Sequence, residues 1–363
     1  LIDGNSLLYR AFYALPLLHT GEGIFTNGVY GFLTMLNRVL EEEKPTHVVV
    51  AFDKGKKTFR NDIYSEYKAN RSAAPDELKG QFQLIRETLN ALNITYIEME
   101  GFEGDDIIGT LSKNAADQGT ETVIVTGDGD ELQLVSDKVR LIMTKKGISE
   151  SETYGPVQVQ EKWEVDPEKL IEVKALMGDT SDNIPGVPGV GRKTAVKLIK
   201  EFGCLENIYE NLDKVSGKKL VERLSENKDQ AFTSRQLGTI VRDMDIDYNL
   251  ENYVYGEPDY PALVNMYKRL EFNNFLKALQ EKGSTGQEFE DSDLEVDVLE
   301  TEDQVKEFVN SIEDNAELVL YIAADYHHPM WAKFEEIYFA VKGQVYNLPL
   351  EDNCAEKLEL IKP

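Results

Sequence analysis

The sequence predicts an α/β protein with a mostly parallel sheet, followed by an α-helical region and a smaller, truncated α/β unit. Three observations support this prediction. Residues 1–175 alternate short β-rich runs with amphipathic helical patterns. Residues 168–280 show helical patterns, and nine acidic residues without a base follow from Glu288 to Asp303. At 363 residues, the chain is long enough for two or three domains.

Five β-rich runs alternate with four helical patterns in the first region. The predicted strands are Leu1–Asp3, His47–Phe52, Ile94–Glu98, Thr122–Val125 and Val139–Met143. The predicted helices are Ser6–Leu15, Val29–Glu41, Glu77–Ala91 and Asp105–Ala116. Strands joined by helices form right-handed parallel units, and ligands bind such sheets at the carboxyl ends of the strands. In the last segment, Gln304–Ser311 is predicted to be helical, and Glu317–Ala324 and Ile337–Val341 to be paired strands.

The net charge of −27 is unevenly distributed. Residues 285–363 contribute −15, from 20 acids and 5 bases, so residues 1–284 contribute −12. An acidic chain argues against nucleic-acid binding, because Lys and Arg are the residues that bind phosphates. Contacts are decided by local patches, however, and two basic patches keep DNA binding open. The acidic stretch within residues 284–303 predicts a solvated linker.

Several other classes are excluded by composition. No apolar run approaches the ~18–20 residues of a membrane span and no signal peptide is visible, so no membrane partner is expected. Cys204 and Cys354 lie too far apart for a disulfide framework or a thiolate zinc site, and the four histidines form no HExxH-type pair. These observations predict a reducing compartment, the cytoplasm. The start of the chain reads as the end of a buried strand, which predicts that a few natural residues precede Leu1.

Acidic residues follow almost every predicted strand. They are Asp3 after the first strand, Asp53 after the second, Glu103, Asp105 and Asp106 after the third, Asp128 and Asp130 after the fourth, and Asp179 and Asp182 where the sheet region meets the helical region. Each also has an ordinary interpretation as a helix N-cap, an Asx turn or a loop charge. Nine carboxylates at one edge would repel one another unless cations lay among them, and oxygen ligands suit Mg²⁺ or Mn²⁺. The pattern therefore predicts two metal ions that activate water and stabilise the leaving oxygen in phosphodiester cleavage.

The first basic patch, residues 54–71, directly follows Asp53 and holds six bases and two acids. Phe59, Tyr64 and Tyr67 are interleaved with the bases. Bases bind phosphates and aromatic rings stack on unpaired nucleobases, so the patch predicts a single-strand site above the acids. The alternative is a solvated lysine-rich loop.

The second basic patch, residues 183–200, contains no acid and has four bases, Arg192, Lys193, Lys197 and Lys200. Two of its glycines have the spacing of a P-loop, but Arg192 replaces the required Lys and no strand precedes it, so a nucleotide site is rejected. A helix-hairpin-helix type turn fits better: Gly189 and Gly191 let backbone amides approach a phosphate, and the next helix starts at Lys193 and Thr194. A plain connection between helices is the alternative.

Six segments together resemble the 5′ nuclease region of bacterial DNA polymerase I, a branch of the flap endonuclease family. In chain order they are LIDGNSLLYRAFYALP, VVVAFD, TFR with YKANR, GFEGDDIIGT, TGDGDELQLV and GDTSDNIPGVPGVGRKTA. The resemblance covers residues 1–280 and its motifs are highly specific. It implies a PIN-like nuclease domain with a helical arch, followed by a helix-hairpin-helix type region. The implied activity is a structure-specific 5′ nuclease that removes flaps and RNA primers in replication and repair.

Matched by position, the resemblance also implies roles for individual residues. The first metal would be held by Asp3, Asp53, Glu103 and Asp105, and the second by Asp128, Asp130 and Asp182, with Asp106 and Asp179 as outer-sphere support. Near the arch, the implied catalytic residues are Arg10, Lys68 and Arg71, and the implied DNA-binding residues are Arg60 and Tyr67. In the second patch, DNA contacts are implied for Gly189, Gly191, Arg192, Lys193, Thr194 and Lys197. The glycine loop would hold the duplex phosphate through K⁺.

The end of the chain resembles the opening of a 3′–5′ exonuclease-type domain. An active domain has an Asp-x-Glu pair after its first strand, whereas only Asp325 stands there in this sequence. We therefore predict no proofreading activity. The predicted domains are 1–175, PIN-like nuclease; 176–283, helical DNA-binding region; 284–303, acidic linker; and 304–363, the start of a degenerate exonuclease-like domain.

The expected partners are DNA with 5′ flaps, nicks or RNA primers and the rest of a polymerase chain, with the protein itself monomeric. Three alternatives stay open. A PIN-type ribonuclease would share the acids without needing the second basic patch. A stand-alone 5′–3′ exonuclease would not need the acidic linker and the last unit. A non-catalytic DNA-binding module would tolerate neutral residues among the nine acidic positions, all of which are acidic here.

Overall fold

The structure is a computed structural model that describes residues 1–145, 147–283, 296–299, 301–312, 318–324, 334–341 and 344–350. The chain divides into two compact units, Leu1–Leu279 and Gln280–Pro363. Each unit is described by itself. Among the described residues, no helix is long and apolar enough to cross a membrane.

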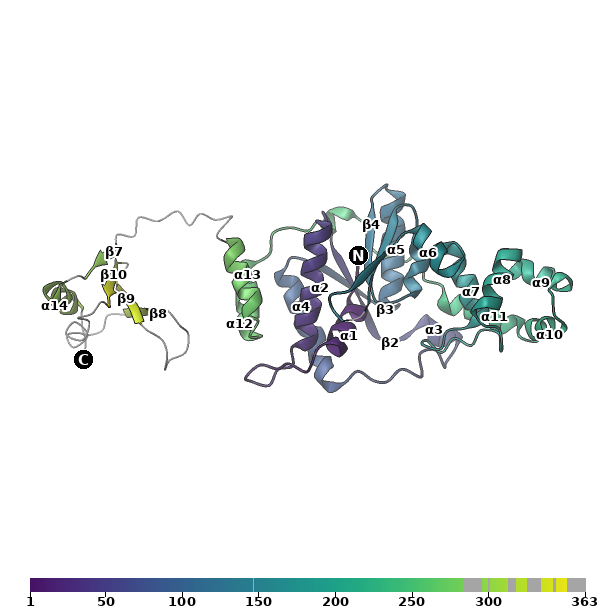
Figure 1. Cartoon of the computed structure of the whole chain (residues 1–363), viewed down its shortest axis with the longest axis horizontal. Coiled ribbons are helices and arrows are strands. Elements are labelled where there is room, and N and C mark those ends of the chain that lie inside the picture. Colours follow the sequence, from purple (N-terminus) through teal and green to yellow (C-terminus); the bar gives the residue numbers. More distant parts are fainter. Residues whose placement is uncertain are drawn as a thin grey trace. The chain divides into compact units, whose positions relative to one another are not determined.

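The first unit is built on a six-stranded sheet with the strand order β3-β2-β1-β4-β5-β6 (Figure 1). Its strands are β1 (Ile2–Asp3), β2 (Val49–Thr58), β3 (Thr95–Gly101), β4 (Thr122–Thr126), β5 (Val139–Thr144) and β6 (Ser151–Tyr154). All neighbouring strands pair in parallel except β5 and β6. This confirms the predicted α/β class. The sequence does not predict β6, because its residues Ser-Glu-Thr-Tyr contain no apolar run.

Helices cover both faces of this sheet. The main ones are α1 (Gly4–Ala14), α2 (Asn27–Glu43), α4 (Asp76–Ala91) and α5 (Gly104–Asp117). Side chains alternate along β2, so that Val50 and Phe52 pack into a core with α1, α2 and α4, whereas Val49 and Ala51 pack into a second core with α5. The apolar residues of the predicted strands and helices therefore form two separate cores, one on each face of the sheet.

Two turns between strands and helices place acids at one edge of the sheet. Asp3 caps α1, where its carboxylate accepts a hydrogen bond from the helix backbone. A side chain at the next residue, Gly4, would lie 2.4 Å from the Phe52 ring, so glycine allows α1 to approach β2 closely. Glu103 caps α5 in a capping box with Asp106. The acids are thus fixed by the first turns of two helices.

Strand β2 is longer than predicted. The sequence predicts that the strand ends at Phe52 and that Asp53 follows it, whereas Asp53 lies inside β2 and faces Met99 of β3 in register. The pairing with β3 continues to Thr58 through a register shift. The residues after Asp53 are mostly basic and show no apolar alternation, so the sequence does not predict this part of the strand. It is held in the sheet by hydrogen bonds to β3.

Helices dominate the rest of the first unit, which confirms the predicted helical region. They are α6 (Pro156–Trp163), α7 (Leu170–Met177), α8 (Arg192–Phe202), α9 (Leu205–Glu210), α10 (Lys218–Glu226), α11 (Lys228–Gly238), α12 (Tyr260–Arg269) and α13 (Asn273–Gly283). One continuous buried cluster joins Ile124 of the sheet to Leu176 of α7 and Leu198 of α8. The predicted domain boundary after residue 175 falls within α7, inside this shared core.

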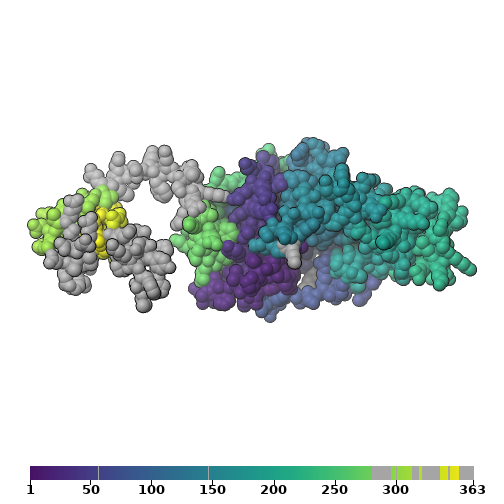
Figure 2. Space-filling model, viewed as in Figure 1, coloured from purple at the N-terminus to yellow at the C-terminus, as the bar shows by residue number. Residues whose placement is uncertain are grey.

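The last helices return to the beginning of the chain. The Tyr30 ring of α2 lies 5.3 Å from the Phe272 ring and 5.2 Å from the Phe275 ring of α13. In Figure 2, the green α12 and α13 lie against the purple N-terminal part of the first unit. The last two helices of the helical region therefore complete the core on the α2 side of the sheet.

The second unit contains α14 (Glu302–Ser311) and a sheet with the strand order β7-β10-β9-β8. Its strands are β7 (Val296–Val298), β8 (Leu318–Ala324), β9 (Phe334–Val341) and β10 (Gln344–Pro349). The predicted helix is confirmed, as is the predicted pairing of the two strands, β8 and β9, which the structure shows to be antiparallel. Phe308, Phe339 and Leu348 form its core. Asp325 and most of the predicted linker lie outside the described residues.

Candidate metal centre and nucleic-acid interface

The position of β1 between β2 and β4 gathers acids from several strands at one edge of the sheet. Asp3 ends β1, Asp53 lies on β2 and Asp128 follows β4. The Asp53 carboxylate accepts from the Asn5 amide and from the backbone N–H of Gly104, both at 2.7 Å. It therefore ties β2 to the starts of α1 and α5, as expected where parallel strands end together.

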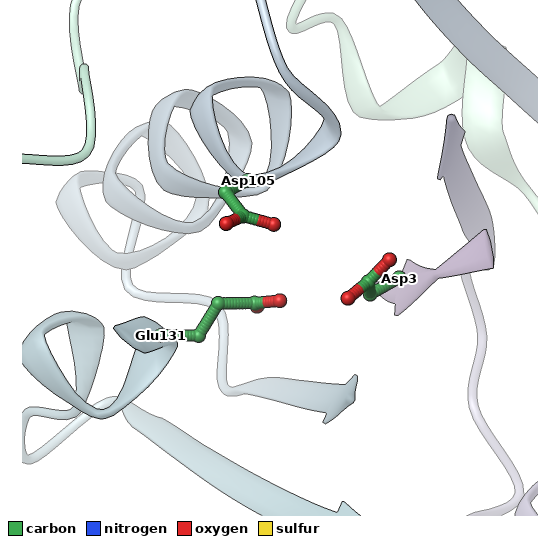
Figure 3. A group of neighbouring side chains, drawn as sticks. All are labelled: Asp3, Asp105 and Glu131. Carbon is green, nitrogen blue, oxygen red and sulfur yellow. The ribbon is translucent and has the colours of Figure 1, made fainter. Parts of the chain in front are cut away.

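Three acids of this edge meet most closely. One carboxylate oxygen from each of Asp3, Asp105 and Glu131 lies within 4.8 Å of the other two. Figure 3 shows the three carboxylates pointing toward one another from β1, from the start of α5 and from the 3-10 helix η1 (Asp130–Leu134). We call these residues the buried trio. Within the described residues, none of them forms an ion pair.

Glu131 was missed by sequence reasoning. It follows two predicted acids directly, but a charged residue beside a loop is usually solvent-exposed. Here the turn of η1 directs it inward and it is fully buried, with 0% exposure. The sequence carries no signal that separates Glu131 from a surface acid, because its burial depends on contacts with β1 and α5.

Four other acids are paired with basic side chains, and we call them the paired quartet: Glu103, Asp130, Asp179 and Asp182. Lys68 donates to Glu103 at 2.8 Å and lies 3.6 Å from Asp182, which also pairs with Arg71. The first basic patch thus contacts the acids directly through three of its bases, since Arg60 also lies 3.7 Å from Glu103. This proximity agrees with the prediction that the patch lies above the acid cluster.

Lys174 of α7 pairs with the rest of the quartet. It contacts Asp130 and lies 3.0 Å from Asp179, and it is only 7% exposed. The sequence gives no functional signal for Lys174, since a single lysine in a helix is ordinarily a surface charge. Its role depends on packing between α7 and η1, which come from different parts of the chain.

The acids differ in the direction in which their surroundings shift the pKa. Burial, opposed by hydrogen bonds from Ser6 and Thr126, raises the pKa of Asp3 to about 7. Burial and neighbouring carboxylates also raise the pKa of Asp105 and of Glu131 well above the usual range. Burial acts in the same direction on Asp179, but hydrogen bonds from Ser181 and the charge of Lys174 lower its pKa below the ordinary value. The buried trio therefore lacks the positive charge that the paired quartet has.

The residues present fit divalent cations. The acidic side chains gathered at this edge would bind a cation through carboxylate oxygens, the hard ligands that Mg²⁺ and Mn²⁺ prefer. Asp128, which lies beside them, also has a raised pKa because of burial and of the charge on Asp182. A cation would remove the cost of keeping these buried carboxylates ionised.

Arg60 and Asp106 form a structural pair instead of facing the site. Arg60 is 2% exposed and its guanidinium donates two 2.7 Å hydrogen bonds to Asp106. Its remaining donors bind the carbonyls of Leu237 and Thr239 at 2.8 Å. Asp106 also accepts from backbone N–H groups. In this structure Arg60 is buried in these contacts, and Asp106 links α5 to the segment after α11.

The aromatic residues of the first basic patch are also used in packing. Tyr67 is 4% exposed and packs on Ile184 and Leu237, with Tyr64 beside it. The Tyr67 hydroxyl lies 3.2 Å from both Glu103 and Asp182. The sequence predicts rings that stack on nucleobases, whereas these two rings anchor the segment between β2 and α4 to the helical region. That segment contains one short helix, α3 (Phe59–Ile63).

Arg10 lies at the same edge. It is half-buried on α1, and a side chain at Gly127 would lie 3.0 Å from its Nε. This Nε is buried and has no hydrogen-bond partner among the described residues. Arg10 therefore offers an unused donor beside the loop that carries Asp128.

The second basic patch surrounds the start of α8. Gly191 is the N-cap of α8, Lys193 and Lys197 are exposed, and Thr194 is half-buried. Gly189 has a φ of +75°, which favours glycine. Arg192 stacks over the Trp163 ring at 4.1 Å. The turn thus has the glycine geometry that the sequence predicts. Within the described residues, neither Lys193 nor Lys197 forms an ion pair, whereas Lys200 pairs with Glu164.

The mostly parallel sheet and the carboxylates at one of its edges place this chain in the class of α/β nucleases. Residues 1–164 match the 5′–3′ exonuclease, N-terminal resolvase-like domain, and residues 165–261 match the 5′–3′ exonuclease, C-terminal SAM fold. The chain belongs to the 5′–3′ exonuclease family. This confirms the resemblance deduced from the sequence.

Relatives and solved structures agree with this assignment. DNA polymerase I of Bacillus subtilis is 46% identical over 328 residues, and that of Bacillus caldotenax 44% over 328 residues; each match covers 90% of this chain and 37% of the relative. The chain thus spans about a third of the length of these relatives. A T5 5′-exonuclease solved with zinc ions has a TM-score of 0.56 at 23% identity, over 74% of this chain and 96% of that one. The catalytic core of Rad2 in complex with a DNA substrate has a TM-score of 0.53 at 21% identity, over 74% and 85%. Both share the fold.

Proposed function

We propose that the protein is a structure-specific 5′ nuclease that cleaves DNA phosphodiesters with two divalent cations, Mg²⁺ or Mn²⁺. The observation that carries this proposal is the convergence of acidic residues at one edge of the sheet, including three whose oxygens lie within 4.8 Å of one another. The family assignment and the metal-bound T5 exonuclease of the same fold support it.

The carboxylates would share the two cations. We assign Asp3, Asp53, Glu103 and Asp105 to the first, and Asp128, Asp130 and Asp182 to the second, with Asp179 positioning Lys174 and Asp106 positioning Arg60. When bound, the cations supply an activated water and stabilise the leaving oxygen. The chain itself fixes the ligands, since β1, α5 and η1 hold them on short, buried turns.

Basic residues next to the acids would bind the scissile phosphate. Lys68 and Arg71 pair with Glu103 and Asp182, so they lie within reach of a phosphate bound at the same place. When cations neutralise these acids, the two basic groups become available to the substrate. The unused Nε of Arg10 provides a third donor. We therefore assign Lys68, Arg71 and Arg10 to substrate positioning and charge stabilisation.

The second basic patch would hold the duplex part of the substrate. Lys193 and Lys197 are exposed on the first turns of α8, and Gly189 and Gly191 are exposed in the turn before it. We propose phosphate contacts from these residues, from Arg192 and from Thr194, with K⁺ at the glycine turn. Arg60 and Tyr67 would support this surface indirectly, by anchoring the segment that carries Lys68.

The relatives suggest the biological setting. We propose that this chain acts at 5′ flaps, nicks and RNA primers, as part of a longer DNA polymerase I in the bacterial cytoplasm and as a monomer. We retain residues 1–175 and 176–283 as nuclease and DNA-binding regions, while noting that they share one core. The 284–303 linker and a degenerate exonuclease-like unit at 304–363 complete the proposed organisation.

A 5′-labelled flap substrate tests the proposed function. We expect cleavage near the flap junction with Mg²⁺ or Mn²⁺ and none in EDTA. A single-stranded RNA without a duplex should be cleaved much more slowly, because it leaves the second basic patch empty. Equal cleavage of both substrates would favour a PIN-type ribonuclease, and flap binding without cleavage in any metal would favour a binding module.

A further inference from the structure

Glu131 is the carboxylate that the assignments above leave without a role. It lies on η1 directly after Asp130, and its side chain is fully buried. Neither of its oxygens has a hydrogen-bond partner among the described residues. Its carboxylate points at those of Asp3 and Asp105 (Figure 3). Burying a carboxylate without a hydrogen-bond partner costs free energy, so the position of Glu131 requires an explanation.

The neighbouring groups do not provide a partner. The Thr126 hydroxyl is close, but it donates its proton to Asp3 at 2.8 Å. The Leu1 nitrogen donates to the Val123 carbonyl at 2.8 Å. Lys68, Arg71 and Lys174 pair with the quartet instead. Among the described residues, the nearest charged groups that Glu131 faces are therefore the carboxylates of Asp3 and Asp105.

The separation of the oxygens suits a single cation. Oxygen ligands lie about 2.0–2.1 Å from Mg²⁺ and about 2.3–2.6 Å from Ca²⁺, so two ligands on opposite sides of one ion are about 4–5 Å apart. The three oxygens lie within 4.8 Å of one another. They are carried by a strand end, a helix start and a 3-10 helix, which fix their relative positions. A small movement of the side chains would bring all three to one ion.

We propose that Glu131 is an additional ligand of the divalent cation that Asp3 and Asp105 hold. This inference rests on the proposed function and deepens it, because it adds a buried, fifth carboxylate to the four assigned to the first cation. Glu131 approaches from η1, on the same turn as Asp130. It thereby couples the position of the first cation to the segment that carries a ligand of the second.

The test is Mn²⁺ binding to the whole 363-residue chain without DNA, measured by titration calorimetry. Three variants are compared with the wild type: Glu131→Gln, Glu131→Asp and, as a control, Asp137→Asn, which removes one exposed charge from the same loop. We expect Glu131→Gln to weaken one Mn²⁺ site by about 10-fold or more. Glu131→Asp keeps the charge but shortens the reach, and it should weaken the same site by a smaller factor. Asp137→Asn should stay within twofold.

The outcomes separate the possible failures. Wild-type affinity in Glu131→Gln overturns the inference, since glutamine has the shape of a protonated glutamate that serves only in packing. Weak binding in Glu131→Gln with wild-type binding in Glu131→Asp also overturns it, because the charge alone would then be sufficient. A wild type that binds no Mn²⁺ refutes the proposed function itself. Circular dichroism in EDTA checks that each variant folds, and Glu131→Asp decides the question should Glu131→Gln not fold.

Discussion

The buried trio and the paired quartet contain the same residue types at the same edge of the sheet, yet their surroundings differ. In the quartet, Lys68, Arg71 and Lys174 lie among the carboxylates. In the trio, acids face acids, and the pKa of Asp3 rises to about 7 because of burial. Where a basic side chain is present, as at Asp179, the pKa falls instead.

This difference indicates that the two groups of carboxylates have different roles in cation binding. Buried carboxylates without a basic partner stay ionised at neutral pH only when a cation is bound, whereas carboxylates held by lysine and arginine are balanced already. The partners of the quartet come from the 59–75 segment and from α7, both outside the central strands. We infer that the trio provides the permanent cation site, while the quartet exchanges its basic partners for cation and substrate.

The largest expected effect comes from removing a carboxylate of the quartet. Asp130→Asn should reduce flap cleavage by about 10³-fold or more, because ligand number and geometry decide both metal occupancy and water activation. Binding of flap DNA should survive and should tighten in EDTA, since one negative charge is lost. Single-turnover cleavage and filter binding on the same preparation measure the two effects. Equal losses of binding and cleavage, with the fold intact, would place Asp130 in the binding scaffold instead.

The double variant Lys68→Ala/Arg71→Ala tests whether the basic partners of the quartet serve the substrate. Cleavage should fall by about 100-fold, because the two oriented charges together contribute a few kcal/mol at the transition state. Single-turnover rates at saturating enzyme measure the loss. Lys79→Ala, a variant of an exposed lysine on α4, serves as the control. Rates within twofold of the wild type would contradict the assignment of both residues.

Lys174→Met should convert the Asp130–Asp179 part of the quartet into a second unpaired site. Removing one partner of a buried ion pair typically costs about 3–5 kcal/mol, so the melting temperature in EDTA should fall. Mn²⁺ should bind about 10-fold more tightly, because it no longer competes with the ammonium group. Thermal melts with and without Mn²⁺ measure both effects. A variant whose metal affinity is unchanged would show that Lys174 and the cation occupy separate places.

The pH dependence of stability should distinguish the trio in the metal-free protein. The pKa of Asp3 is about 7 in the folded protein, whereas in the unfolded chain it has its ordinary value of 3.8. Between these values the folded state binds more protons, so the free energy of unfolding should decrease as the pH rises. Asp3→Asn should lack this contribution, and saturating Mg²⁺ should abolish it in the wild type. Denaturant titrations in EDTA at several pH values provide the measurement; parallel curves for wild type and Asp3→Asn would refute the shifted pKa.

The smallest effect is expected outside both groups, in the second basic patch. Lys193→Ala should weaken flap binding modestly and lower the slope of log affinity against log salt by roughly one unit, since it removes one phosphate contact. Cleavage at saturating enzyme should stay unchanged. Salt titrations of binding measure the slope. An unchanged slope would mean that Lys193 does not touch the DNA backbone.

The sequence by itself determined the class of fold and most of the acids. Strand and helix periodicity are local properties, and an acid at the end of a parallel strand reaches the same edge whatever the details of packing. Asp3, Asp128 and the acids that begin α5 therefore lie where the sequence predicts them. Asp53 was predicted at the right edge, although pairing with β3 carries the strand past it.

Only the tertiary structure decided which charges pair and which stay alone. Lys174 and Asp130 are 44 residues apart in the chain, and nothing local marks either as the partner of the other. Arg60 and Tyr67 have the composition of an exposed nucleic-acid patch, but contacts with residues near Leu237 bury them. Glu131 turns inward because η1 packs against α5, α7 and β5. Burial and pairing depend on segments distant in sequence, so they arise only when the chain has folded.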